Sequence, residues 1–106
     1  MASSRQYLDY VLDQLSGLDG VSSRAMMGEF ILYCQGKVVG GIYDDRLLVK
    51  PTASAARLLP HARLEPPYEG AKAMLLVDDV DDRELLCELM PAVARELPWP
   101  KRKKGV

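Results

Sequence analysis

The segment from residue 21 to residue 50 constrains the fold most, because short apolar runs alternate in it with two-residue turn signals. Phe30 to Cys34 is one such run, and the pair Gln35-Gly36 follows it. A glycine in the second turn position tolerates the positive φ that tight hairpins require. Val38 to Tyr43 is the next run, and Asp44-Asp45 reverses the chain again. The pattern predicts a meander of three or four antiparallel strands, at about 21–26, 30–34, 38–43 and 46–50.

Alternation within the second of these strands assigns its side chains to two faces. Phe30, Leu32 and Cys34 share one face, whereas Ile31 and Tyr33 lie on the other. Both faces are rather apolar, so each requires cover or a tolerance of water. We expect helices on one face only, which leaves the second face for a partner.

Two adjacent glycines, Gly40 and Gly41, interrupt the third strand. Glycine in a strand costs about 0.5–1 kcal/mol in chain entropy and offers no side chain to pack. Such a pair indicates a β-bulge or a close approach of another backbone. A ligand approaching the backbone is the alternative.

Helices are predicted on both sides of the meander. Apolar residues recur at three- and four-residue steps over residues 3–17, with Ser3 or Ser4 as the N-cap. A short helix is expected at 53–59 and a short strand at 74–77. Asp81 and Glu84 resemble a capping box before a last helix that ends near residue 96, which Pro91 should kink or split. Residues 60–73, between the short helix and the short strand, form a loop of a length that is often functional.

These elements predict an α+β fold: a two-layer domain, with an antiparallel β-meander of four to five strands and helices packed on one face. A chain of 106 residues, 48% hydrophobic and 27% charged, forms one such domain. We assign residues 1–98 to the domain and 99–106 to a basic, flexible tail.

The net charge of −1 is unevenly distributed. Four of the fourteen basic residues lie together in the tail, so ten basic residues face fifteen acidic ones elsewhere, a balance of about −5. An acidic body disfavours broad nucleic-acid binding, although a basic tail with an aromatic residue can associate weakly with DNA. A merely solvated tail is the alternative. The tail residues concerned are Trp99, Lys101, Arg102, Lys103 and Lys104.

The N-terminal residues show no signal peptide, and no apolar run approaches the ~20 residues that span a bilayer. We therefore expect a cytoplasmic protein that makes no use of a membrane. Cys34 and Cys87 form no paired motif and are expected to be free thiols.

Little in the sequence indicates catalysis or metal binding. His61, Cys34 and Cys87 lack metal-ligand spacing, and a catalytic triad would need a base next to a nucleophile. The acidic residues at 78–84 lack the register of a calcium loop and suit a helix start instead. We expect no metal, no cofactor and no catalytic residue, and hence no enzyme.

One set of residues does suggest binding. Arg24 stands at the entrance to the sheet, Lys50 at its exit, and Tyr68, Glu69 and Lys72 in the long loop. If Arg24, Lys50, Tyr68 and Lys72 converge, the cations and the phenol would form a site for a small anion or carboxylate. The alternative is structural: Arg24 pairs with a carboxylate such as Glu69, and Tyr68 covers the sheet edge.

Several local motifs resemble those of the TfoX/Sxy family of bacterial competence regulators, in their N-terminal domain. They are Arg24-Ala25-Met26-Met27-Gly28, the hairpin at 32–37, Leu47 to Lys50, Tyr68-Glu69-Gly70-Ala71-Lys72, and Leu97-Pro98-Trp99-Pro100-Lys101. The resemblance implies a two-layer domain with helices on one side of an antiparallel sheet and no established catalytic residues. It also implies a role in transcription together with the cyclic-AMP receptor protein.

The sequence departs from the family pattern in two ways. Met27 replaces an aromatic residue, and Glu29 and Ile31 occupy places that often hold glycine. Full-length competence regulators also carry a second, helical domain, whereas this sequence stops at Val106. The fold therefore transfers better than the biological role.

We interpret the chain as a non-enzymatic regulatory or protein-interaction module. The partner would meet the sheet face bearing Tyr33 and Tyr43, or the loop around Tyr68, because aromatic anchors dominate many interfaces. A homodimer through the exposed sheet face or an edge is expected. Two other functions remain as alternatives: an anion-binding or enzymatic domain that uses the Arg24, Lys50, Tyr68 and Lys72 group, and weak DNA association through the tail.

Overall fold

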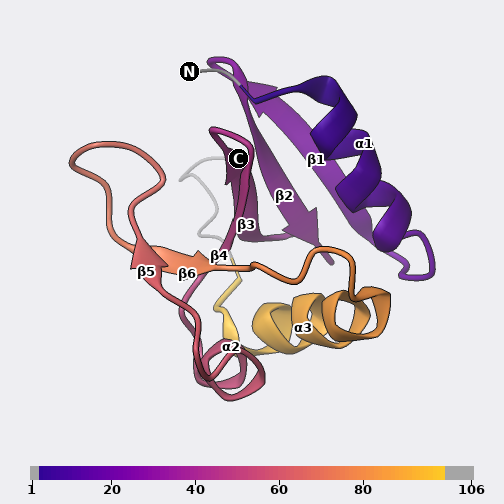
Figure 1. Cartoon of the computed structure of the whole chain (residues 1–106). Coiled ribbons are helices and arrows are strands. Elements are labelled where there is room, and N and C mark those ends of the chain that lie inside the picture. The colour runs from indigo at the N-terminus through magenta and orange to yellow at the C-terminus, as the bar shows by residue number, and fades with distance from the viewer. Residues whose placement is uncertain (1–2, 100–106) are drawn as a thin grey trace, which may run out of the picture.

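The computed structural model describes residues 3–99 and shows an α+β domain with one six-stranded antiparallel sheet (Figure 1). The strands follow the order β1-β2-β3-β4-β6-β5 across the sheet. The elements are α1 (Arg5–Gln14), β1 (Val21–Met26), β2 (Glu29–Cys34), β3 (Lys37–Tyr43), β4 (Arg46–Val49), α2 (Ala53–Leu58), β5 (Leu64–Glu65), β6 (Met74–Leu76) and α3 (Arg83–Glu96).

The predicted fold class is confirmed, with six strands in place of four or five. The additional strand is β5, which lies within the segment expected to be a structureless loop. It comprises only Leu64 and Glu65, paired with Leu75 and Met74 of β6. Two residues are too few to show an alternating pattern in the sequence, so only the pairing with β6 defines this strand.

Three two-residue turns connect β1 to β4, and each has positive φ at both central positions. Gln35-Gly36 and Asp44-Asp45 were expected from the sequence, and their φ angles are +54°, +81°, +54° and +54°. The first turn is Met27-Gly28, where Met27 has a φ of +52° and is 98% exposed. Turns of this kind match the twist of the flanking strands and set the register of the hairpins.

The core lies between one face of the sheet and the helices α1 and α3. Burial alternates along β2 as predicted, with Phe30, Leu32 and Cys34 buried and the residues between them half-buried. Leu8 and Val11 of α1 pack in the same cluster. Figure 1 shows α1 and α3 on one side of the sheet and the loop between β5 and β6 on the other.

As far as residues 3–99 are concerned, the second face of the sheet is open over β1 to β3 but not over β4. Leu48 points away from the helices, because it pairs with Gly41 and Leu76 on that face, yet it is fully buried. The expectation of a wholly free face is therefore wrong for β4, where the chain covers itself.

Both glycines in β3 are required by close contacts. The register shifts between Leu32 and Tyr33, so a bulge lies opposite them in β3, as predicted. A Cβ on Gly40 would lie 2.1 Å from the carbonyl oxygen of Leu48, and one on Gly41 would lie 2.6 Å from the ring of Tyr43. Backbone therefore approaches Gly40, and an aromatic ring covers Gly41.

The helix boundaries differ in detail from the predictions. Helix α1 is shorter than the predicted 3–17, and its N-cap is Ser4, whose hydroxyl accepts a bond from the amide of Tyr7. Helix α3 begins after Asp82, not Asp81, and continues through Pro91 without being split. Buried residues on both sides of the proline, Met90 and Val93 among them, hold the helix in place. Among residues 3–99, no helix is both long enough and apolar enough to cross a membrane.

Candidate functional site: a groove beside the 66–73 loop

An open groove of about 520 Å³ lies between the open sheet face and the 66–73 loop. Its walls are mainly apolar, with two tyrosines and two lysines among them. Among residues 3–99, no aspartate or glutamate lines it, so its charge is positive although the body of the domain is acidic. The lining residues are Val38, Gly40, Tyr43, Lys50, Pro51, Thr52, Pro67, Tyr68, Ala71, Lys72, Ala73, Met74 and Leu97.

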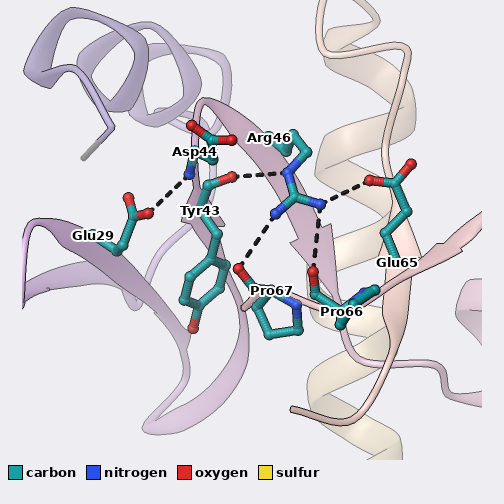
Figure 2. Close-up of polar contacts among 7 residues, drawn as sticks. All are labelled: Glu29, Tyr43, Asp44, Arg46, Glu65, Pro66 and Pro67. Carbon is teal, nitrogen blue, oxygen red and sulfur yellow. Dashed lines mark hydrogen bonds and ion pairs between the residues drawn. The ribbon is translucent and has the colours of Figure 1, made fainter. Parts of the chain in front are cut away.

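Arg46 fixes the start of the loop that forms one wall of the groove. Its Nη1 contacts Oε1 of Glu65 at 2.7 Å, and both side chains are only about a quarter exposed, at 28% and 27%. The same nitrogen also donates to the carbonyl of Pro66 at 3.4 Å, whereas Nε donates to the carbonyl of Tyr43 at 3.1 Å and Nη2 to that of Pro67 at 3.3 Å (Figure 2). Prolines lack an amide with which to join a sheet, so the arginine supplies the donors that hold this segment.

A pair of tyrosines forms the aromatic part of the groove. The rings of Tyr43 and Tyr68 lie 6.4 Å apart between centroids, with 57° between their planes. Tyr43 is half-buried, whereas Tyr68 is 66% exposed. Burial raises the pKa of Tyr43, and the neighbouring Tyr68, Glu29 and Tyr33 add to the effect. The Tyr43 phenol is therefore neutral near neutral pH and can donate a hydrogen bond.

The structure brings together three of the four residues predicted to bind an anion. Lys50, Tyr68 and Lys72 all line the groove, and Arg24 does not. Arg24 lies in the edge strand β1, where it pairs with Ile31. The four residues were expected to form a site only if they converge, and Arg24 does not join the others because β2 and β3 lie between β1 and β4 in the sheet.

The alternative contact between Arg24 and Glu69 is absent from the ion pairs among residues 3–99. The ion pair that anchors this loop joins Arg46 to Glu65 instead. Neither residue was predicted from the sequence to be part of a site. Glu65 belongs to the strand that was not predicted, and Arg46 looked like an ordinary first residue of β4.

Glu29, which replaces a common glycine of the family pattern, ties three segments together. Its Oε1 accepts a bond from the amide of Ser3 at 2.9 Å, and its Oε2 accepts one from the amide of Asp44 at 3.0 Å. Figure 2 shows Glu29 reaching the turn that contains Asp44. Glu29 thus holds Ser3 against the tips of two hairpins.

The predicted interaction residue Tyr33 lies on the open face next to the groove. It pairs with Ser22 on one side and Val38 on the other, and it is half-buried. Val38 itself lines the groove, so the face of β2 and the groove form one continuous surface.

Trp99 lies against the β2–β3 turn. The Lys37 Nζ is 4.5 Å from the centroid of its ring and also donates to the carbonyl of Ala94 at 2.9 Å. Trp99 is nevertheless 70% exposed. The other residues proposed for a nucleic-acid tail, Lys101, Arg102, Lys103 and Lys104, lie outside the described residues.

The groups considered for metal binding lie apart. Within residues 3–99, no three His, Cys, Asp or Glu side chains gather in a way that could hold a metal ion. His61 lines a separate hollow of about 150 Å³ with Asp78 and Asp79, away from the groove. Both cysteines are free thiols, as expected; Cys34 is buried, and this burial raises its thiol pKa.

Comparison with known proteins agrees with the resemblance read from the motifs. The family description of the TfoX N-terminal domain matches residues 13–90, which include all six strands. The chain belongs to the TfoX N-terminal domain family. It is also 35% identical over 106 residues to an uncharacterized 12.7 kDa protein in the trpE 5′ region of Spirochaeta aurantia, covering 99% of this chain and 92% of that protein. No solved structure shows a significant match.

The region matched to the TfoX N-terminal domain contains most of the groove. Lys50, Tyr68 and Lys72 lie within it, as do Arg46 and Glu65, whose ion pair anchors the 66–73 loop. Leu97 and Trp99 lie beyond it.

Proposed function

We propose that this TfoX N-terminal domain is a non-enzymatic regulatory module that binds a protein partner in the groove beside the 66–73 loop. The observation that carries the proposal is the groove itself: apolar and aromatic walls with two lysines and no carboxylate, on a sheet face without helices. Interfaces commonly have an apolar, aromatic centre and a polar rim, and this surface has that arrangement.

The chemistry of the groove selects for a partner segment with an apolar anchor and acidic side chains. Tyr43, Tyr68 and Met74 offer the contact surface for the anchor, and Lys50 and Lys72 pair with the carboxylates. Exposed ion pairs contribute only about 0–1 kcal/mol each, so most of the affinity must come from the aromatic centre. The lysines chiefly steer the encounter and reject basic segments.

Membership of the family supports a role in transcriptional regulation, including that of competence. The cyclic-AMP receptor protein, with which competence regulators of the family act, is the first partner to test. A regulatory role of this kind requires a binding surface and no catalytic group, which agrees with the composition of the groove.

The test is a binding titration between the domain and the cyclic-AMP receptor protein, preceded by a pull-down from native cells. Tyr68→Ala should weaken binding at least about 30-fold, the equivalent of a hot spot of about 2 kcal/mol. Leu64→Ala is the matched control, because Leu64 is similarly exposed (60%) but lies outside the groove. Equal affinities of the two variants for a partner would refute the assignment of the groove.

The lysines are tested by reversing their charge. Lys50→Glu with Lys72→Glu should slow association and reduce its salt dependence. Arg63→Glu provides the control, since Arg63 is exposed and does not line the groove. A similar change in association rate for the control would assign the effect to net charge instead of the groove.

The size of the groove supports a second candidate function, the binding of a small anionic ligand. Ligand sites commonly measure about 300–1,000 Å³, and this groove lies within that range. Titration with phosphate, nucleotides and small carboxylates, monitored by the NMR shifts of the loop amides, distinguishes the small-ligand function from the protein-partner function. Saturable shifts at Lys50, Tyr68 and Lys72 would favour the small ligand, and their absence would favour the protein partner.

Association with DNA through the tail is tested independently of the groove. A salt-dependent mobility shift that disappears when residues 101–106 are deleted would support it. Absence of binding at low salt would dismiss it.

A further inference from the structure

Within the described part of the chain, residues 3–99, the outer edge of β1 is unprotected, in contrast to the opposite edge of the sheet. β1 is six residues long, has no proline, no lysine and no bulge, and four of its residues are exposed. β5, at the other edge, has only two residues and is followed by Pro66-Pro67. Sheets usually protect an edge by such shortening and by proline, and an edge without these devices is ready to pair with another strand.

The hairpin geometry shows which groups of β1 face outward. A two-residue turn makes the flanking pair, Met26 and Glu29, a hydrogen-bonded pair, and such pairs alternate along an antiparallel ladder. The bond from the Gln35 amide to the Gly20 carbonyl fits this alternation. The amides and carbonyls of the alternate residues Val21, Ser23 and Ala25 therefore point away from β2.

We propose that a second copy of this chain pairs with β1 in antiparallel orientation, centred on Ser23, and joins the two sheets into one. In this register Ser23 faces Ser23 of the second copy, and Val21 faces Ala25. All three outward amides and all three outward carbonyls of each strand are then satisfied. Registers shifted by one pair in either direction leave one residue of each strand unpaired.

Charge distinguishes the Ser23-centred register from the one shifted towards Ala25. Arg24 is the one charged residue of β1. Shifting the pairing towards Ala25 would place the two Arg24 side chains directly opposite each other, which is destabilising. In the proposed register each Arg24 faces Ser22 of the second copy, a small side chain that leaves room for the guanidinium.

The same register gives Arg24 an interaction that residues 3–99 of its own chain do not offer. Its guanidinium forms no hydrogen bond or ion pair with residues 3–99. Within each chain Ser22 pairs with Tyr33, on the open face. Arg24 therefore extends over Ser22 of the second copy towards the Tyr33 ring beyond it, where an arginine can stack on the aromatic face.

The register is tested by disulfide capture between two different single variants, Ser22→Cys and Arg24→Cys. These positions oppose each other across the proposed interface as a non-hydrogen-bonded pair, with Cα atoms about 4.5 Å apart, which lies within disulfide range. Oxidising an equal mixture should give a covalent dimer containing both variants. Each variant oxidised alone should give no covalent dimer. The wild type, oxidised in the same way, controls for cross-links through Cys34 and Cys87. Cross-linking within a single variant, or none in the mixture, would overturn the register.

The association itself is tested with Ser23→Pro, examined by light scattering and sedimentation. The Ser23 amide points away from β2, so proline there removes an interface bond and none within the chain. The wild type should have twice the monomer mass at high concentration, and Ser23→Pro the monomer mass with unchanged circular dichroism. Arg24→Ala should weaken dimerisation about 5-fold or more without unfolding the domain. A wild type that stays monomeric would refute the proposal, whatever the variants do.

Discussion

Replacing Arg46 by methionine should destabilise the domain and loosen the wall of the groove. The change keeps the length of the aliphatic stem but removes every donor that the arginine provides. In the native structure the Glu65 carboxylate lies 2.7 Å from the arginine; in the variant it would have no cation beside it, although its side chain is only 27% exposed. The carbonyls of Tyr43, Pro66 and Pro67 lose their donors as well.

The magnitude follows from the geometry of these contacts. A hydrogen bond to a charged group contributes about 1.5–3 kcal/mol, and the residual exposure of the pair reduces that figure through solvent screening. Two of the carbonyl contacts are long, at 3.3 and 3.4 Å, and add little. We expect a loss of about 2 kcal/mol in the free energy of unfolding, equivalent to a 30-fold change in the folding equilibrium.

The assay is urea unfolding of the variant beside a matched control, Arg5→Met. Arg5 pairs with Asp9 at 3.3 Å, but these side chains are 76% and 62% exposed, so its loss should cost less than about 0.5 kcal/mol. Hydrogen exchange locates the effect, because the Ala71 amide bonds to the Tyr68 carbonyl inside the loop and should exchange faster in Arg46→Met. Equal midpoints for the two variants, or unchanged exchange at Ala71, would refute the role of Arg46 in anchoring the loop.

Three further predictions concern the sheet and its turns. Gly40→Ala should lower the free energy of unfolding by about 3 kcal/mol or more, because the new Cβ would lie 2.1 Å from the Leu48 carbonyl oxygen. Gly17→Ala is the control: a Cβ there would meet nothing within 4 Å, so the urea midpoint should be nearly unchanged. Met27→Asn should raise the free energy of unfolding by about 1 kcal/mol, since methionine is strained at a φ of +52° and asparagine followed by glycine suits the turn; a lower urea midpoint than the wild type would contradict this. Burial raises the pKa of both Tyr7 and Tyr43, so the folded state holds these protons more tightly than the unfolded state, and stability should fall as the pH rises above about 10. Tyr43→Phe should reduce that alkaline loss in unfolding measured against pH, and an unchanged slope would argue against Tyr43 as a source.

The parts of the fold that the sequence predicted depend on local rules. Alternation over five residues assigned Phe30 and Ile31 to opposite faces, and the turn chemistry of Gln35-Gly36 placed the β2–β3 hairpin within one residue of its observed bounds. Gly40-Gly41 indicated a bulge because a strand tolerates glycine for few reasons. Each of these inferences uses neighbours in the sequence, and each is confirmed.

The parts that the sequence did not predict depend on contacts between distant residues. Strand β5 exists only through its pairing with β6, and Arg46 reaches Glu65 across nineteen positions. Nothing in the residues around Arg46 distinguishes it from Arg57 or Arg63, which are exposed. Three members of the predicted anion-binding set do meet, because β4 and the 66–73 loop border one groove, but strand order keeps Arg24 at the far edge.

That separation allows the two proposed surfaces to act together. Pairing through β1 leaves β3, β4 and the 66–73 loop uncovered, so a dimer would present two grooves at a fixed spacing. A partner that is itself a symmetric dimer would then bind both grooves, and the second contact would benefit from a high effective concentration. Ser23→Pro should therefore weaken binding to a dimeric partner but leave the affinity for an isolated acidic segment unchanged. Tyr68→Ala should weaken both, and a Ser23→Pro variant that lost affinity for the isolated segment would show that the edge and the groove are not independent.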